Sequence, residues 1–192
     1  MFDFKDYNIA DWFSFYRIAA APFLLAVLYF DARIVFATLL FISYSTDAID
    51  GFLARKYNIS SNRGARLDSM GDQITVMIGI LGIFLFEFEF IKQYALPIIL
   101  VLSLNILQQI IALIKYKRTT AFHTLLAKTG AAVEALFVIW LLFFGPVIWL
   151  FYVVIVIAIL EACEEIALIF MYKNWVAGVK GIYWAKHDKR RD

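Results

Sequence analysis

Residues 47–72 read DAIDGFLARKYNISSNRGARLDSMGD, which places four aspartates in one short stretch of an otherwise apolar chain. Asp47 and Asp50 are three positions apart, and a helix brings side chains at that spacing to one face. Asp68 and Asp72, four positions apart, share a face in the same way. Carboxylates at the end of a membrane helix are costly unless something neutralises them. Four together indicate divalent cations, and divalent cations beside a membrane indicate phosphate chemistry.

The composition of the 192-residue chain is typical of an integral membrane protein. Hydrophobic residues make up 63% of it and aromatic residues 18%, whereas a soluble domain is nearer half apolar. A spanning helix needs about 20 largely apolar residues, and six stretches qualify. They cover residues 9–30, 34–54, 67–88, 94–115, 127–145 and 147–172. We therefore predict an all-α integral membrane protein, with residues 1–192 forming a single domain of six transmembrane helices and short interfacial helices at its ends.

The basic residues predict the orientation of the spans. Of 18 Lys and Arg residues, only Arg33 and Lys92 fall on one side of the membrane, and the other 16 fall on the side of the termini. Because positive charge is retained in the cytoplasm, both termini are expected there. The aromatic and basic tail, residues 173–192, is expected to lie at the interface and touch anionic headgroups, unless it is only a retention anchor.

The predicted topology brings the two pairs of aspartates together. The second span runs inward and ends near Arg55, and the third begins near Leu67. All four aspartates are therefore expected at one depth on the cytoplasmic side. The alternative is that they are structural ion-pair partners of Arg55, Arg63 and Arg66, but such pairs would not need small residues between the carboxylates.

Small residues follow the first aspartate on its helical face. Gly51 and Ala54 come four and seven positions after Asp47 and leave a slot beside the carboxylates. A planar base or a sugar fits such a slot, where a larger side chain would block it. Arg55 adds a rigid positive fork suited to phosphate. Gly64 is expected to permit a tight turn or a close backbone approach.

At these residues the chain resembles the CDP-alcohol phosphotransferase family. The signature of that family is D-x-x-D-G-x-x-A-R, eight residues, then G-x-x-x-D-x-x-x-D. Every fixed position is matched at the same spacing, by Asp47, Asp50, Gly51, Ala54, Arg55, Gly64, Asp68 and Asp72. The first span agrees loosely, with Ser14, Arg17 and Pro22 at comparable places, whereas Asp11 departs from the asparagine that many members carry.

The resemblance implies a metal-dependent transferase of phospholipid biosynthesis. In such enzymes a CDP-linked alcohol donates its phosphoalcohol group to a hydroxyl, and CMP leaves. The resemblance also implies a homodimer, and two divalent cations, Mg²⁺ or Mn²⁺, which both favour oxygen ligands. The implied metal ligands are Asp47, Asp50, Asp68 and Asp72, with Asp72 also the general base. We expect the CDP group to contact Asp47, Gly51, Ala54, Arg55, Gly64 and Asp68.

The short chain resembles the compact prokaryotic phosphatidyltransferases, which implies CDP-diacylglycerol as the donor and a prokaryotic plasma membrane as the location. A basic cluster favours a phosphorylated acceptor, such as glycerol 3-phosphate or an inositol phosphate, over serine. Its residues are Arg66, Lys115, Lys117, Arg118, His123 and Lys128. Plain positive-inside topology is the other explanation of this cluster. A phosphatidylserine-type synthase, and a CDP-choline or CDP-ethanolamine transferase that uses diacylglycerol, remain alternatives.

A six-span transporter is the competing class of function. An ion path would place charges through the whole thickness of the membrane, whereas here they gather in the cytoplasmic third. Nothing in the chain indicates a nucleic-acid partner. Four further acids have no place in the signature, and the sequence leaves open whether they orient Lys128 or Arg17 or line the acceptor cavity. They are Glu134, Glu161, Glu164 and Glu165.

Overall fold

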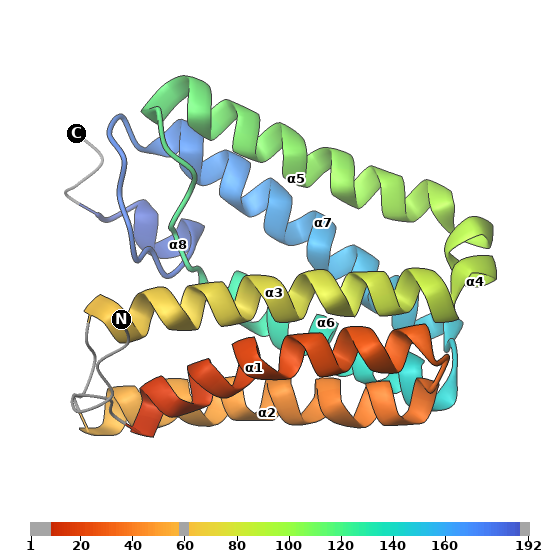
Figure 1. The fold of residues 1–192 in the computed structure, drawn as a ribbon. Coiled ribbons are helices and arrows are strands. Elements are labelled where there is room, and N and C mark those ends of the chain that lie inside the picture. The colour runs from red at the N-terminus through yellow and green to blue at the C-terminus, as the bar shows by residue number, and fades with distance from the viewer. Residues whose placement is uncertain (1–8, 58–61, 189–192) are drawn as a thin grey trace. The chain divides into compact units, whose positions relative to one another are not determined.

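A computed structural model describes residues 9–57 and 62–188 of the chain (Figure 1). The regular structure of these residues is α-helical, and no strand occurs in them, which confirms the prediction of an all-α fold. The helices are α1 (Ile9–Tyr29), α2 (Arg33–Tyr57), α3 (Asn62–Phe86), α4 (Phe88–Gln93), α5 (Ala95–Tyr116), α6 (Leu125–Phe144), α7 (Ile148–Met171) and α8 (Ile182–Ala185).

Two helices in the described part of the chain, α5 and α6, are by themselves long and apolar enough to cross a membrane. Among the described residues, α1, α2 and α3 contain the shorter apolar stretches Phe15–Tyr29, Arg33–Thr46 and Met70–Phe86. α7 has 24 residues but carries three glutamates in its second half. The presence of apolar helices agrees with a membrane protein, and the count of six spans stays a prediction.

Helix α3 begins at Asn62, more than one turn before the apolar stretch that starts near Leu67. Gly64 therefore lies inside the first turn of a helix and not in a tight turn between spans. The physical reason is that the arginines and alanine around Gly64 are good helix formers, and helical hydrogen bonding does not stop where apolar residues stop.

The chain forms two compact units. Unit 1 comprises Met1–Phe88 and Val138–Gly145, and thus holds α1, α2, α3 and the end of α6. Within it α1 packs against both α2 and α3 (Figure 1). The buried core of unit 1 draws Leu24, Phe36, Leu40, Ile78 and Leu142 from these four helices.

A close approach of α2 and α3 depends on one glycine. A Cβ atom at Gly82 of α3 would lie 2.3 Å from Cε1 of Phe36, which is fully buried. No side chain can occupy that space while the Phe36 ring is packed there, so glycine is required at this position.

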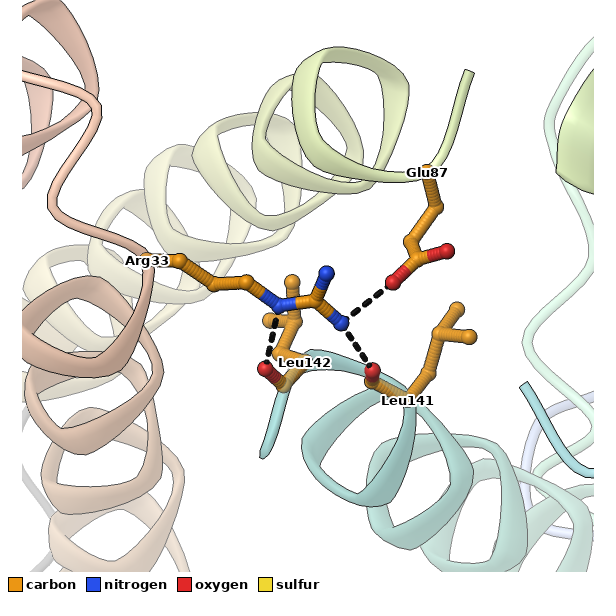
Figure 2. Close-up of polar contacts among 4 residues, drawn as sticks. All are labelled: Arg33, Glu87, Leu141 and Leu142. Atoms are coloured by element: carbon orange, nitrogen blue, oxygen red, sulfur yellow. Dashed lines mark hydrogen bonds and ion pairs between the residues drawn. The ribbon is translucent and has the colours of Figure 1, made fainter. Parts of the chain in front are cut away.

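An arginine fastens three helix ends of unit 1 together, as Figure 2 shows. Arg33 at the start of α2 donates from Nε to the Leu142 carbonyl at 2.8 Å and from Nη2 to the Leu141 carbonyl at 2.7 Å. Its Nη2 also pairs with the carboxylate of Glu87, directly after α3. The Leu141 carbonyl also accepts from the Gly145 amide at 2.9 Å. Arg33 thus adds a donor there and caps the Leu142 carbonyl in the last turn of α6.

Unit 2 comprises Glu89–Phe137 and Pro146–Asp192. In it α5 packs along α7, and α8 packs on α7. The chain after α7 runs beside the connection between α5 and α6, with one isolated bridge between Ala177 and Ala121. Val179 donates its amide to the Phe122 carbonyl at 2.8 Å, and Leu125 donates to the Lys180 carbonyl at 3.0 Å. We call residues 172–188 the C-terminal strap.

Candidate functional site

The two segments that carry the aspartates lie at the same end of unit 1. Because α1, α2 and α3 follow one another in alternating directions, α2 ends where α3 and α1 begin (Figure 1). Asp47 and Asp50 lie in the last turns of α2, and Asp68 and Asp72 lie in the first turns of α3. The side chains of Asp47, Asp50 and Asp68 lie outside the part of the structure that is described, whereas that of Asp72 lies within it.

Asp72 forms an ion pair with Arg17 of α1. The guanidinium Nη1 donates to Asp72 Oδ1 at 2.6 Å. The side chain of Arg17 is 1% exposed, and that of Asp72 is 44% exposed. A buried arginine needs an acceptor of opposite charge, and a hydrogen bond between two charged groups is short and strong.

The sequence placed Arg17 only as a loose match in the first span and did not predict this ion pair. The glutamates of α6 and α7 were possible partners of Arg17 on the sequence alone, and the ion pair found is with Asp72. The signal that points to such a pair is an arginine within an apolar helix, which requires a counter-charge on a neighbouring helix.

Carboxylate oxygens suit Mg²⁺ and Mn²⁺, which are hard cations. The four aspartates offer only such oxygens, from two helix segments that meet at one end of unit 1, so the donor set fits these ions. Among the side chains that the structure describes, no group of three or more His, Cys, Asp or Glu is placed to hold a metal. Three of the four predicted ligands are not among those side chains.

The predicted nucleotide slot lies on a continuous helix. α2 runs unbroken from Arg33 to Tyr57, so Gly51 and Ala54 keep the helical spacing to Asp47 on which the slot depends. The side chains of Ala54 and Arg55 are not described, and nor are the surroundings of Gly51 and Gly64.

The basic residues expected to bind the acceptor lie mostly in unit 2, and two of them already have partners there. Lys115 donates from Nζ to the Ile169 carbonyl at 2.7 Å. The guanidinium of Arg118 lies 5.8 Å from the ring centre of Trp175, in the C-terminal strap. The other three in this unit are exposed, and they are Lys117, His123 and Lys128. The remaining member, Arg66, belongs to α3 of unit 1, and its side chain is not described.

Two glutamates of α7 stabilise the connections of unit 2. Glu165, which is 9% exposed, accepts a hydrogen bond from Thr120 Oγ1 at 2.8 Å and another from the side-chain Nε2 of Gln108. Glu164 Oε1 accepts from the backbone amide of Ile182 at 3.3 Å. These carboxylates attach the α5–α6 connection and the C-terminal strap to α7, which gives them structural roles that the sequence had left open.

Comparison with known proteins identifies a family that this chain matches. The sequence profile of the CDP-alcohol phosphatidyltransferase family matches residues 7–179. Proteins named CDP-diacylglycerol--glycerol-3-phosphate 3-phosphatidyltransferase are also similar. Those of Rickettsia bellii (strain RML369-C), Salmonella choleraesuis (strain SC-B67) and Wigglesworthia glossinidia brevipalpis are 35%, 39% and 36% identical over 74, 75 and 77 residues. These matches cover 37–38% of this chain and 41–42% of each relative, so the chain spans about two fifths of the length of the curated relatives it matches.

Proposed function

The chain belongs to the CDP-alcohol phosphatidyltransferase family, and from this we propose that it transfers the phosphatidyl group of CDP-diacylglycerol to the hydroxyl of a small polar acceptor. Glycerol 3-phosphate is the acceptor we favour, because each of the three relatives above carries it in its name. The observation that carries the proposal is the complete acidic signature on two helix segments that meet at one end of unit 1.

The aspartates supply the metal ligands and the base in this proposal. Two divalent cations, Mg²⁺ or Mn²⁺, when bound would neutralise the oxygens of the diphosphate and stabilise the leaving CMP. The proposed ligands are Asp47, Asp50, Asp68 and Asp72. Oxygen-only donors at one end of the helices support this assignment.

The reaction itself needs one proton acceptor. Asp72 takes the proton from the acceptor hydroxyl, and the hydroxyl oxygen forms a bond to the phosphorus that carries diacylglycerol. The bond between that phosphorus and the phosphate oxygen of CMP breaks, so CMP leaves and a phosphatidyl ester remains. The partial exposure of the Asp72 side chain supports this role, because a base must be reachable by the acceptor.

The chain's other residues bind and orient the substrates. Gly51 and Ala54 leave space for the cytidine, and Arg55 pairs with a phosphate of the CDP group. Exposed basic residues of unit 2 attract the phosphate of the acceptor in this proposal. They are Lys117 and His123 in the α5–α6 connection and Lys128 in the first turn of α6.

The proposed setting is the inner leaflet of a prokaryotic plasma membrane, with six spans, both termini in the cytoplasm and two copies of the chain per enzyme. The bacterial origin of the relatives supports this setting. So does the asymmetry of the basic residues, of which 16 of 18 are predicted on one side.

The product of the reaction tests the proposed function. Purified full-length chain in lipid nanodiscs is given radiolabelled CDP-diacylglycerol with Mg²⁺ and, in separate reactions, glycerol 3-phosphate, inositol phosphate, inositol, serine or ethanolamine. We expect CMP release and a new lipid, phosphatidylglycerol phosphate, only with glycerol 3-phosphate. A lipid formed with another alcohol would correct the acceptor, and no CMP release with any alcohol would contradict the proposal.

A further inference from the structure

We infer that Arg17 of α1 is a positioning residue, which holds the carboxylate of Asp72 in one orientation for its work in the site. The inference rests on the proposed function, because it takes Asp72 to be the base and a metal ligand. Its starting point is the bond of 2.6 Å between Arg17 Nη1 and Asp72 Oδ1.

The burial of the two partners is unequal, and this inequality leaves the carboxylate available for further contacts. The guanidinium side is enclosed, with Arg17 at 1% exposure, while Asp72 keeps 44% of its side chain exposed. A carboxylate this exposed can still be reached by a cation or by the acceptor hydroxyl. Its bond to the enclosed guanidinium restricts the side chain to one rotamer.

The bond to Arg17 is compatible with chemistry at Asp72. An ionised carboxylate has two oxygens and about four lone-pair sites, so one that accepts a bond from an arginine can also ligate a cation or accept a proton. Arg17 is itself held in place by its burial. A functional side chain is positioned accurately only when the residues that support it are also held in place. When the base is loosely held, the reaction is slower even though the base keeps its charge.

The charge of Arg17 should affect cation binding in a way that distinguishes a positioning residue from a merely structural one. A positive charge beside the aspartates repels divalent cations and weakens their binding. Removing it should therefore strengthen cation binding while turnover falls. Loss of a structural residue would instead weaken both, because the ligands would no longer be held together.

Unit 1 offers a matched control for this test. Arg33 also forms an ion pair, with the carboxylate of Glu87 directly after α3. This pair lies at the end of unit 1 away from the aspartates. Arg33→Met thus removes the same side chain and a similar ion pair without touching the proposed site. Arg17→Lys is the conservative variant, which keeps the charge but lacks the planar fork of the guanidinium.

The experiment measures kcat and KM for CDP-diacylglycerol and, without lipid substrate, the affinity for Mn²⁺ by electron paramagnetic resonance. For Arg17→Met we expect kcat to fall about 100-fold with little change in KM, and Mn²⁺ to bind at least about threefold more tightly. Arg17→Lys should bind Mn²⁺ as the wild type does and recover part of kcat. Arg33→Met should leave both quantities at the wild-type level.

Other results would overturn the inference. Wild-type kcat in Arg17→Met, or a kcat loss accompanied by weaker Mn²⁺ binding, would show that Arg17 does not position Asp72. If Arg17→Met does not fold, Arg17→Lys decides: full wild-type kcat in that variant would refute the need for the guanidinium fork. Absence of CMP release by the wild type would instead refute the proposed function, and the Mn²⁺ comparison alone would then decide whether Arg17 acts on the aspartates.

Discussion

Arg33 and Glu87 form an ion pair at the end of unit 1 opposite to the pair of Arg17 and Asp72. The first pair joins the start of α2 to the end of α3 and also reaches two carbonyls in the last turn of α6. The second joins Arg17, in the first half of α1, to Asp72, in the third turn of α3. Each pair thus links the α3 segment to one neighbouring helix, and only the pair of Arg17 and Asp72 lies beside the proposed site.

Replacing Arg33 by methionine should destabilise the protein without affecting its chemistry. Glu87, which is 9% exposed at its side chain, would lose its partner, and two carbonyls of α6 would lose a donor. We expect a loss of about 2 kcal/mol in unfolding free energy. Thermal unfolding in detergent measures it, with Arg33→Lys as the control that keeps the charge. An unchanged unfolding midpoint in Arg33→Met would show that the pair adds nothing to stability.

Replacing Asp72 by asparagine should stop turnover while most cation binding survives. Asparagine keeps the size and one oxygen of the side chain but cannot accept the proton of the hydroxyl. We expect kcat to fall by about 10³-fold, as is usual when a general base is removed. Mn²⁺ binding to the variant, measured in parallel, separates loss of the base from loss of the site. Turnover at the wild-type rate would reject Asp72 as the base.

A leucine at Gly51 should block the proposed slot for the nucleotide. The helix would be preserved, because leucine is a better helix former than glycine. We expect the affinity for CDP-diacylglycerol to fall at least about tenfold, which is about 1.4 kcal/mol. Ile49→Leu, at an exposed position of the same helix, is the matched control and should bind like the wild type. Equal affinity in Gly51→Leu and in the control would show that no slot lies beside Gly51.

The C-terminal strap should affect the acceptor more than the donor. Trp175 donates from Nε1 to the Thr119 carbonyl at 3.0 Å, and its ring lies under the guanidinium of Arg118. Losing one cation–π contact and one hydrogen bond costs about 1–2 kcal/mol together. In Trp175→Ala we therefore expect a higher KM for glycerol 3-phosphate and an unchanged KM for CDP-diacylglycerol.

A matched aromatic control is available for that measurement. Trp184 of α8 is exposed as Trp175 is, but its ring meets that of Tyr183 edge to face within the same short helix. Trp184→Ala should leave both KM values unchanged. A rise in KM for the acceptor in both variants alike would mean that the strap has no particular link to the acceptor-binding bases.

The helices were the most predictable feature, because long apolar stretches leave a chain little other choice in a membrane. The long helices have bounds close to those of the apolar stretches, and the main departure, α3, arises where helix-forming polar residues extend a span. The pairing of the strap with the α5–α6 connection was not predictable. Its hydrogen bonds satisfy backbone groups of two irregular segments, and no residue pattern marks such partners in advance.

The candidate site also has one part that the sequence predicts and one part that it does not. The acidic signature could be read from the spacing of residue types, because a helix converts spacing into a shared face. The ion pair of Arg17 and Asp72 could not, since it joins residues 55 positions apart on different helices. Such a contact depends on how α1 packs against α3, and one sequence does not contain that information in its local pattern.

Anomalous X-ray diffraction from crystals of the chain grown with Mn²⁺ would locate the cations among the aspartates. We expect two Mn²⁺ peaks per chain, each within ligand distance of carboxylate oxygens from Asp47, Asp50, Asp68 or Asp72. Peaks elsewhere in the chain, or no peak among these four side chains at a Mn²⁺ concentration that supports turnover, would contradict this expectation.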